Sequence, residues 1–252
     1  MTSFGRQFGV TAATYDRVRP GYPDALFEML AQAIPAGGSV LDVGAGTGIA
    51  TRELLRRGLR VTALEPDGDM ARQLIARSAG EVDVVTNDFE HYRGPRRAFD
   101  GVVCAQAWHW FAGPSALRRV RRLLSGTGVF AAWWNVGTIA DAQLAKELAV
   151  IFQETSHRLP VLFRRPDLTA TIGNLARLLQ ADLGFSPPEA LHFVSSFTYG
   201  PDDFVALMST MSEVLALSSE DRDHVLDRLR VCLGEVTVEV EYLTLGYMAV
   251  RC

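Results

Sequence analysis

The segment Val40–Gly48 constrains the fold of this chain more than any other part of the sequence. It reads Val-Leu-Asp-Val-Gly-Ala-Gly-Thr-Gly, a short apolar run followed by three alternating glycines. Residues 49–57 then repeat apolar side chains at helical spacing, so the segment predicts a buried strand, a tight glycine turn and a helix. Because glycine has no Cβ, main-chain N–H groups in such a turn can approach a ligand closely.

Apolar runs alternate with helical patterns along the chain, which is typical of parallel β-α units. We expect strands at 39–43, 60–64, 82–86, 99–104, 128–134, 192–199 and 235–251, helices at 49–57, 69–77 and 115–124, and two helices within 201–232. The last strands lack a crossover helix and should pair as a hairpin at the sheet edge. The predicted fold is Rossmann-like α/β, with a seven-stranded, mostly parallel sheet, an antiparallel last strand, helices on both faces and a helical lid.

An acidic residue, Glu65, follows the second predicted strand, 17 positions after Gly48. A carboxylate at that point can accept both hydroxyls of a ribose. A dinucleotide site has the pattern G-x-G-x-x-G, whereas here Gly48 comes one residue early and Ile49 occupies the dinucleotide position. Asp42 would repel a pyrophosphate but suits an ammonium group or a bound water. Together these residues favour S-adenosyl-L-methionine (SAM) over NAD.

Several segments resemble the motifs of class I SAM-dependent methyltransferases. Val40–Gly48 matches their first motif, and Ala63–Asp67, Thr86–Glu90 and Cys104–Phe111 resemble the second, third and fourth. Phe8–Pro23 is similar to the entry segment of bacterial small-molecule methyltransferases, closest to the trans-aconitate methyltransferase-like group. The resemblance covers about residues 1–136. It implies SAM as the cofactor and S-adenosyl-L-homocysteine as its product, but it does not identify the acceptor.

The resemblance also implies roles for single residues. Residues 44–46 would line the methionine portion of SAM, and the main chain of Gln106 would face its ammonium. Tyr15 and Arg19 would close over its carboxylate, which a guanidinium can bind through two parallel hydrogen bonds. The predicted cofactor-binding residues are Tyr15, Arg19, Asp42, Gly44, Ala45, Gly46, Gly48, Glu65, Pro66, Met70, Asp88, Phe89 and Gln106.

Some of these residues also fit structural roles. Pro66 and Met70 are expected to pack on the adenine faces, and Asp88 with Phe89 to flank the ring, but Met70 is equally compatible with the core. Phe89 also fits packing at the sheet edge. Tyr15 and Arg19 also fit a role in anchoring the N-terminal helix.

The acceptor pocket is expected at the ends of the fourth and fifth strands. His109 lies there and is the candidate general base, because an unperturbed imidazole accepts a proton near neutral pH. The alternative is that it packs between two tryptophans and bonds the backbone. We expect one tryptophan of each neighbouring pair to face the pocket, and the candidate substrate-binding residues are Trp108, Trp110 and Trp134.

Composition excludes several classes of function. The net charge of −4 argues against nucleic acid, and the arginines of 118–122 fit a solvated helix face. We expect no metal, because no acidic cluster is placed for Mg²⁺, and no membrane partner, because no apolar run is long enough to span a bilayer. Three cysteines without paired spacing suit the cytoplasm. A monomer or homodimer acting on a small molecule is expected.

The chain is expected to form one domain over residues 1–252. Its predicted parts are an N-terminal helical lid segment at 1–36, a SAM-binding core at 37–136, a helical insertion over the acceptor pocket at 137–189, and the last strands and helices at 190–252. The leading hypothesis is methyl transfer to an O, N, C or carboxylate of a small metabolite. The alternatives are a SAM-binding protein of this fold that does not methylate and, more remotely, an NAD-dependent oxidoreductase.

Overall fold

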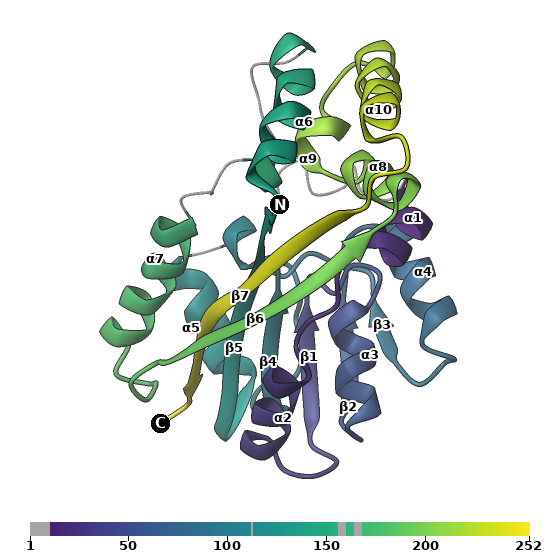
Figure 1. The fold of residues 1–252 in the computed structure, drawn as a ribbon. Coiled ribbons are helices and arrows are strands. Elements are labelled where there is room, and N and C mark those ends of the chain that lie inside the picture. Colours follow the sequence, from purple (N-terminus) through teal and green to yellow (C-terminus); the bar gives the residue numbers. More distant parts are fainter. Residues whose placement is uncertain (1–10, 112, 156–159, 164–167) are drawn as a thin grey trace.

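Seven strands form one sheet in a computed structural model that describes residues 11–111, 113–155, 160–163 and 168–252. The strands are β1 (Ser39–Val43), β2 (Arg60–Leu64), β3 (Asp83–Val85), β4 (Phe99–Ala105), β5 (Leu124–Ile139), β6 (Glu189–Tyr199) and β7 (Val238–Val250). Their order is β3-β2-β1-β4-β5-β7-β6 (Figure 1). Strand β7 pairs antiparallel with both β5 and β6, and the other neighbouring strands pair parallel. The predicted fold class is therefore confirmed.

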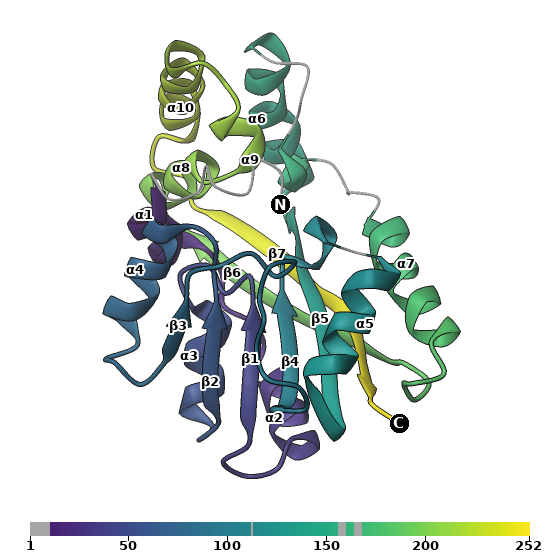
Figure 2. The same cartoon turned by 180° about the vertical axis from the view of Figure 1, so that it is seen from behind.

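Helices cover both faces of the sheet. They are α1 (Ala12–Val18), α2 (Asp24–Ala33), α3 (Ile49–Arg56), α4 (Gly68–Arg77), α5 (Pro114–Leu123), α6 (Ala142–Thr155), α7 (Leu168–Ala181), α8 (Pro201–Ser209), α9 (Ser212–Leu215) and α10 (Ser219–Leu233). Apolar residues of α2 and α3 pack on one face around Trp133. Those of α5 and α7 pack on the other around Phe130 (Figure 2). The burial of apolar side chains on both faces explains why the central strands are almost wholly hydrophobic.

Strands β5, β6 and β7 extend beyond the rest of the sheet. Pairing continues to Ile139 opposite Val240, and the strand ends pack with α6, α8 and α10 into a separate apolar cluster. We call these strand ends and α6, α8, α9 and α10 the upper lobe (Figure 1). The sequence predicted a strand only at 128–134, because pairing with a partner over 100 residues away leaves no local pattern. Three helices, not two, occupy residues 201–233.

The predicted insertion at 137–189 is divided between two places. Helix α6 packs beside α10 in the upper lobe, whereas α7 packs against α5 on a face of the sheet. Residues 156–159 and 164–167 of this segment, like residues 1–10 of the predicted N-terminal lid, lie outside the described residues. Among the described residues no helix is both long and apolar enough to cross a bilayer, and no group of three His, Cys, Asp or Glu residues is placed to hold a metal ion.

Gly246 provides a test of the β5–β7 pairing that carries the upper lobe. It pairs with Trp133, and a Cβ added there would lie 2.1 Å from the carbonyl O of Ala132. Because the obstacle is backbone, Gly246→Ala should lower the free energy of unfolding by about 3 kcal/mol. Chemical denaturation would measure this. Gly126→Ala, where the added Cβ meets nothing within 4 Å, is the control, and equal stability of the two variants would contradict the prediction.

Candidate functional site

A cavity of about 300 Å³ lies at the C-terminal ends of β1, β2, β4 and β5. This is the edge where the turns of a parallel sheet place ligands. The predicted site residues that line it are Tyr15, Arg19, Gly44, Gly46, Glu65, Met70, Gln106, His109, Trp110 and Trp134. The cavity therefore brings together residues from the glycine turn, the end of β2, the end of β4 and the N-terminal segment.

The glycine turn forms the floor of this cavity. Gly44, Gly46 and Gly48 have φ angles of +70°, +58° and +87°, which only glycine adopts at little cost. A Cβ at Gly44 would lie 2.6 Å from the Cβ of Ala107, whereas one at Gly46 would meet no protein atom within 4 Å. The first glycine permits close packing of the turn on β4. The second leaves open space that a ligand can use.

Glu65 ties the end of β2 to the glycine turn. Its two carboxylate oxygens accept hydrogen bonds from the N–H of Gly46 and the N–H of Asp67, each at 2.8 Å. Burial raises the pKa of Glu65 to about 7, with smaller contributions from the charges of Asp67 and Asp42, although the two N–H bonds act in the opposite direction. Each oxygen keeps a second lone pair, so this fixed carboxylate can also accept ribose hydroxyls.

Asp42 lies fully buried in β1, just behind the turn. Its Oδ2 accepts a hydrogen bond of 2.6 Å from the hydroxyl of Thr51, and its Oδ1 has no partner among the described residues. Burial raises the pKa of Asp42 to about 6. An unpartnered buried carboxylate oxygen is costly. The free Oδ1 could accept a hydrogen bond from an ammonium group, such as that of the methionine end of SAM, or from a bridging water.

The N-terminal segment closes one side of the cavity. Arg19 donates from Nε to the hydroxyl of Thr210 (3.0 Å) and from its terminal nitrogen to the carbonyl of Thr210 (2.7 Å). Its guanidinium also lies 4.7 Å from the ring centroid of Tyr15. Arg19 therefore joins α1 to the end of α8, in addition to lining the cavity. The sequence suggested that Arg19 could anchor the N-terminal helix, but it did not identify Thr210 as the partner.

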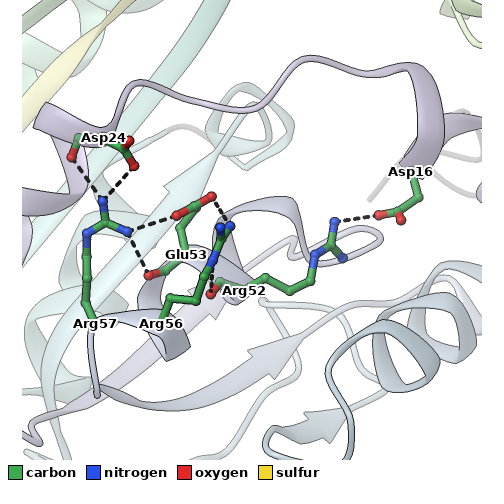
Figure 3. A network of polar contacts seen from close by, with 6 residues as sticks. All are labelled: Asp16, Asp24, Arg52, Glu53, Arg56 and Arg57. Atoms are coloured by element: carbon green, nitrogen blue, oxygen red, sulfur yellow. Dashed lines mark hydrogen bonds and ion pairs between the residues drawn. The ribbon is translucent and has the colours of Figure 1, made fainter.

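Ion pairs hold the N-terminal segment against α3, as Figure 3 shows. Asp16 pairs with Arg52 at 2.8 Å, and Asp24 pairs with Arg57 at 2.9 Å. Only 5% of the Asp16 side chain is exposed, so its pair is less screened by water than a surface pair. Arg52 also donates to the carbonyl of Thr47 in the glycine turn. The network thus positions α1 beside the turn.

His109 is held by a tryptophan. The Nε1–H of Trp134 donates to Nδ1 of His109 at 3.2 Å, and the His109 and Trp110 rings lie 4.6 Å apart. The imidazole exposes part of its surface to the cavity, while the surrounding protein lowers its pKa by desolvation. Because an indole N–H can only donate, Nδ1 must keep its lone pair, and the proton of the neutral ring is on Nε2.

The four tryptophans divide between cavity and core. Trp110 and Trp134 line the cavity, as expected for one member of each pair. Trp108 was predicted to contact substrate but lies 1% exposed in the core, packed against Phe111 and Phe130. The turn of 3₁₀ helix at Trp108–Trp110 points its first residue inward. Sequence spacing alone did not reveal this turn.

Several predicted cofactor residues do not line the cavity. Phe89 is buried and packs on Phe111 at 5.2 Å, and Gly48 faces the side chain of Leu74 on α4. The predicted cofactor residues outside the lining are Asp42, Ala45, Gly48, Pro66, Asp88 and Phe89. Their direct contact with a ligand remains a prediction. Asp42 and Phe89 fit indirect roles, as a buried countercharge and as a packing support.

Other cavity residues were missed by the sequence analysis. Met211, between α8 and α9, and Ser212 and Glu213, at the start of α9, line the cavity from the upper lobe. Asn135 lines it from β5 and bonds both the carbonyl of Gly21 and the hydroxyl of Thr244. Asn135 is a polar residue directly after an apolar strand run, a signal that could have been used. Residues 211–213 carry no such signal.

The comparisons agree with this geometry. A family model described as a methyltransferase domain matches residues 41–132, from β1 to β5. The matched part contains the glycine turn, Glu65 and the end of β4, so it covers the segments whose motifs resemble those of methyltransferases. The trans-aconitate methyltransferase-like subgroup stays a prediction.

The chain is also similar to proteins of known sequence. An uncharacterized methyltransferase of Mycobacterium tuberculosis is 37% identical over 128 residues, 51% of this chain and 51% of the relative. One of Schizosaccharomyces pombe is 25% identical over 222 residues, 87% of this chain and 84% of the relative. The matched region of the first relatives thus spans about half of their length.

Solved structures share the fold. A candidate type II methyltransferase from Anaeromyxobacter dehalogenans superposes with a TM-score of 0.66 at 24% identity, over 92% of this chain and 97% of that chain. A phosphoethanolamine N-methyltransferase of Haemonchus contortus in complex with SAM has a TM-score of 0.54 at 17% identity, over 100% of this chain and 60% of that chain. At these identities the similarity establishes the fold.

The raised pKa of Asp42 makes the stability depend on pH. In the folded protein the carboxyl of Asp42 has a pKa of about 6, whereas its ordinary pKa is 3.8. The unfolded chain therefore binds fewer protons than the folded chain between about pH 4 and 6, and stability from this group is lost as pH rises through that window. Above it, ionised Asp42 costs about 3 kcal/mol.

Asp42→Asn removes this charge and keeps an oxygen for Thr51. The variant should therefore gain stability relative to the wild type at pH 7.5, and the gain should shrink by about 2 kcal/mol at pH 4.5. Urea unfolding at both pH values measures it. Asp223→Asn, at an exposed position in α10, is the control. A difference for Asp42→Asn that does not vary with pH would rule out the buried charge as its cause.

Proposed function

We propose that the chain is a SAM-dependent methyltransferase that acts on a small-molecule acceptor in the cytoplasm, with S-adenosyl-L-homocysteine as the second product. The observation that carries the proposal is the joint position of the glycine turn, the fixed carboxylate of Glu65 and His109 around one cavity. The match of residues 41–132 to a methyltransferase family model supports it. The three cysteines are free, which suits a reducing compartment.

The chain's own residues fit the parts of the cofactor. Glu65 accepts the ribose hydroxyls, and Asp42 supplies the negative charge below the ammonium, directly or through a water. Gly46 leaves room where a side chain would project. Bound SAM supplies a methyl group on a sulfonium, which needs no metal. Met70 and Trp134 provide apolar walls that exclude water from the transfer.

The acceptor enters, in this proposal, under a lid made by α1 and residues 211–213. Tyr15 and Arg19 line the cavity from α1, and Met211 and Glu213 line it from the other side. Transfer to a nucleophile requires mainly that the acceptor be held in line with the methyl group. The cavity volume of about 300 Å³ and its aromatic walls support a small organic acceptor over a macromolecule.

His109 acts as a hydrogen-bond donor to the acceptor and not as the general base that we expected from the sequence. Its Nδ1 is occupied by the N–H of Trp134, so the neutral ring has its proton on Nε2 and offers no free lone pair. Accepting a second proton at Nδ1 would break the hydrogen bond from Trp134 and create a cation, which the desolvated position disfavours. The acceptor should therefore present an oxygen or nitrogen lone pair to an N–H group.

Replacement of Glu65 tests the cofactor site. Glu65→Gln removes the charge that accepts the ribose hydroxyls, and hydrogen bonds to charged groups contribute about 1.5–3 kcal/mol. We expect SAM to bind roughly ten- to one-hundred-fold more weakly by isothermal titration calorimetry. Glu189→Gln, at an exposed position in β6, is the matched control, and thermal unfolding checks that both variants fold. Unchanged SAM affinity would refute the assigned site.

Methyl transfer itself can be tested with methyl-labelled SAM and a library of small carboxylic acids, phenols and amines. Label in one of these, together with formation of S-adenosylhomocysteine, would support the proposed enzyme. SAM binding with no transfer to any acceptor class would favour the alternative, a protein of this fold that binds SAM without methylating.

Two substitutions of His109 distinguish a hydrogen-bond donor from a general base. His109→Gln keeps an N–H donor, so we expect it to retain a substantial part of kcat, whereas His109→Ala should lose roughly ten-fold or more. Trp134→Phe should restore a free Nδ1 and add a pH dependence to kcat/KM that the wild type lacks. Equal losses in the Gln and Ala variants, with an ionisation in the wild-type pH profile that both variants lack, would instead assign His109 as the base.

A further inference from the structure

A second cavity lies at the opposite edge of the sheet and is lined mainly by arginines. Its volume is about 380 Å³, and its charged lining residues are Arg96, Arg118, Arg121, Arg122 and Arg251. They come from the loop before β4, from α5 and from the residue after β7. Guanidinium groups from three parts of the chain that are far apart in sequence therefore line one cavity.

This cavity is remote from the proposed SAM site. Arg96 lies just before the start of β4, and α5 returns toward the starts of the strands before β5 begins. Because β7 is antiparallel, its last residue pairs with Val129 near the beginning of β5. The C-terminus accordingly lies at the lower edge of the sheet, away from the upper lobe (Figure 2). The SAM site occupies the other ends of the same strands.

The positive charge of this cavity is only partly neutralised. Arg121 pairs with Asp182 at 2.7 Å, whereas Arg122 donates to the carbonyl of Gly94 and Arg251 to that of Leu124. Arg96 and Arg118 are exposed and form no hydrogen bond or ion pair with the described residues. Asp182 therefore neutralises one of the five guanidinium groups that line the cavity.

Main-chain hydrogen bonds hold these groups together despite their repulsion. The pKa of Arg251 is lowered by burial and by the charges of Arg97, Arg121 and Arg96. We expected the arginines of 118–122 to mark a solvated helix face. Instead, three of them converge with Arg96 and Arg251 on a shared cavity, an arrangement that is costly without an anion.

We propose that this cavity, which we call the arginine cavity, binds a small oligophosphate, either free pyrophosphate or the diphosphate of a nucleotide. Guanidinium groups form paired hydrogen bonds with phosphate oxygens, and the cavity has the size of a small-molecule site. No aromatic side chain of the described residues lines it. It therefore lacks the stacking surface that single-stranded nucleic acids use. The inference is independent of the proposed methyl transfer.

Calorimetric titration of the full chain with sodium pyrophosphate, ADP, orthophosphate and a DNA duplex, in 0.15 M salt, tests the proposal. Pyrophosphate should bind with one-site stoichiometry and more tightly than orthophosphate. Equal affinity for ADP and pyrophosphate would identify the diphosphate group as the ligand, and tighter binding of ADP would add a nucleoside contact. Both results support the site.

The variant Arg96→Gln/Arg118→Gln removes two unpaired charges at exposed positions and should weaken pyrophosphate binding roughly ten-fold or more. Arg228→Gln/Arg230→Gln makes the same charge change in α10 and should bind like the wild type. Thermal unfolding checks that both variants fold, and SAM affinity should be unchanged in both. No pyrophosphate binding by the wild type, equal loss in the two double variants, or binding of DNA alone would overturn the proposal.

Discussion

The fold and the functional site both depend on the attachment of the end of β2 to the glycine turn after β1. The N–H groups of Gly44 and Ala45 donate to the carbonyl of Leu64, and that of Gly46 donates to the carboxylate of Glu65. These bonds need left-handed backbone angles that side chains resist. The same carboxylate therefore closes the turn and lines the cavity, so one residue belongs to both the fold and the candidate site.

This arrangement places two carboxylates, those of Asp42 and Glu65, where water is scarce. Burial raises their pKa values to about 6 and 7, so the protein without a ligand bears the cost of ionising them at neutral pH. A cation at this position would offset that cost. Ionised Asp42 therefore lowers stability at the same place where the proposed site uses a negative charge.

The rest of the cavity depends on the long strands β5 and β7. Their pairing supports the upper lobe, which brings Met211 and Glu213 over the turn. Arg19 connects α1 to the same lobe through Thr210, and the ion pair of Asp16 with Arg52 fixes α1 from below. The arginine cavity lies at the edge of the sheet that faces away from the upper lobe.

The sequence by itself determined the features that one stretch of chain encodes. The glycine turn and the strand–turn–helix around it follow from residues 40–57, and seven strands with an antiparallel last one follow from local periodicity. Only the tertiary structure decided the side-chain environments. It buried Trp108 while Trp110 lines the cavity, joined His109 to Trp134, and brought residues 211–213 and the five arginines to their cavities. These contacts join residues far apart in the chain, and their geometry depends on packing that no local pattern records.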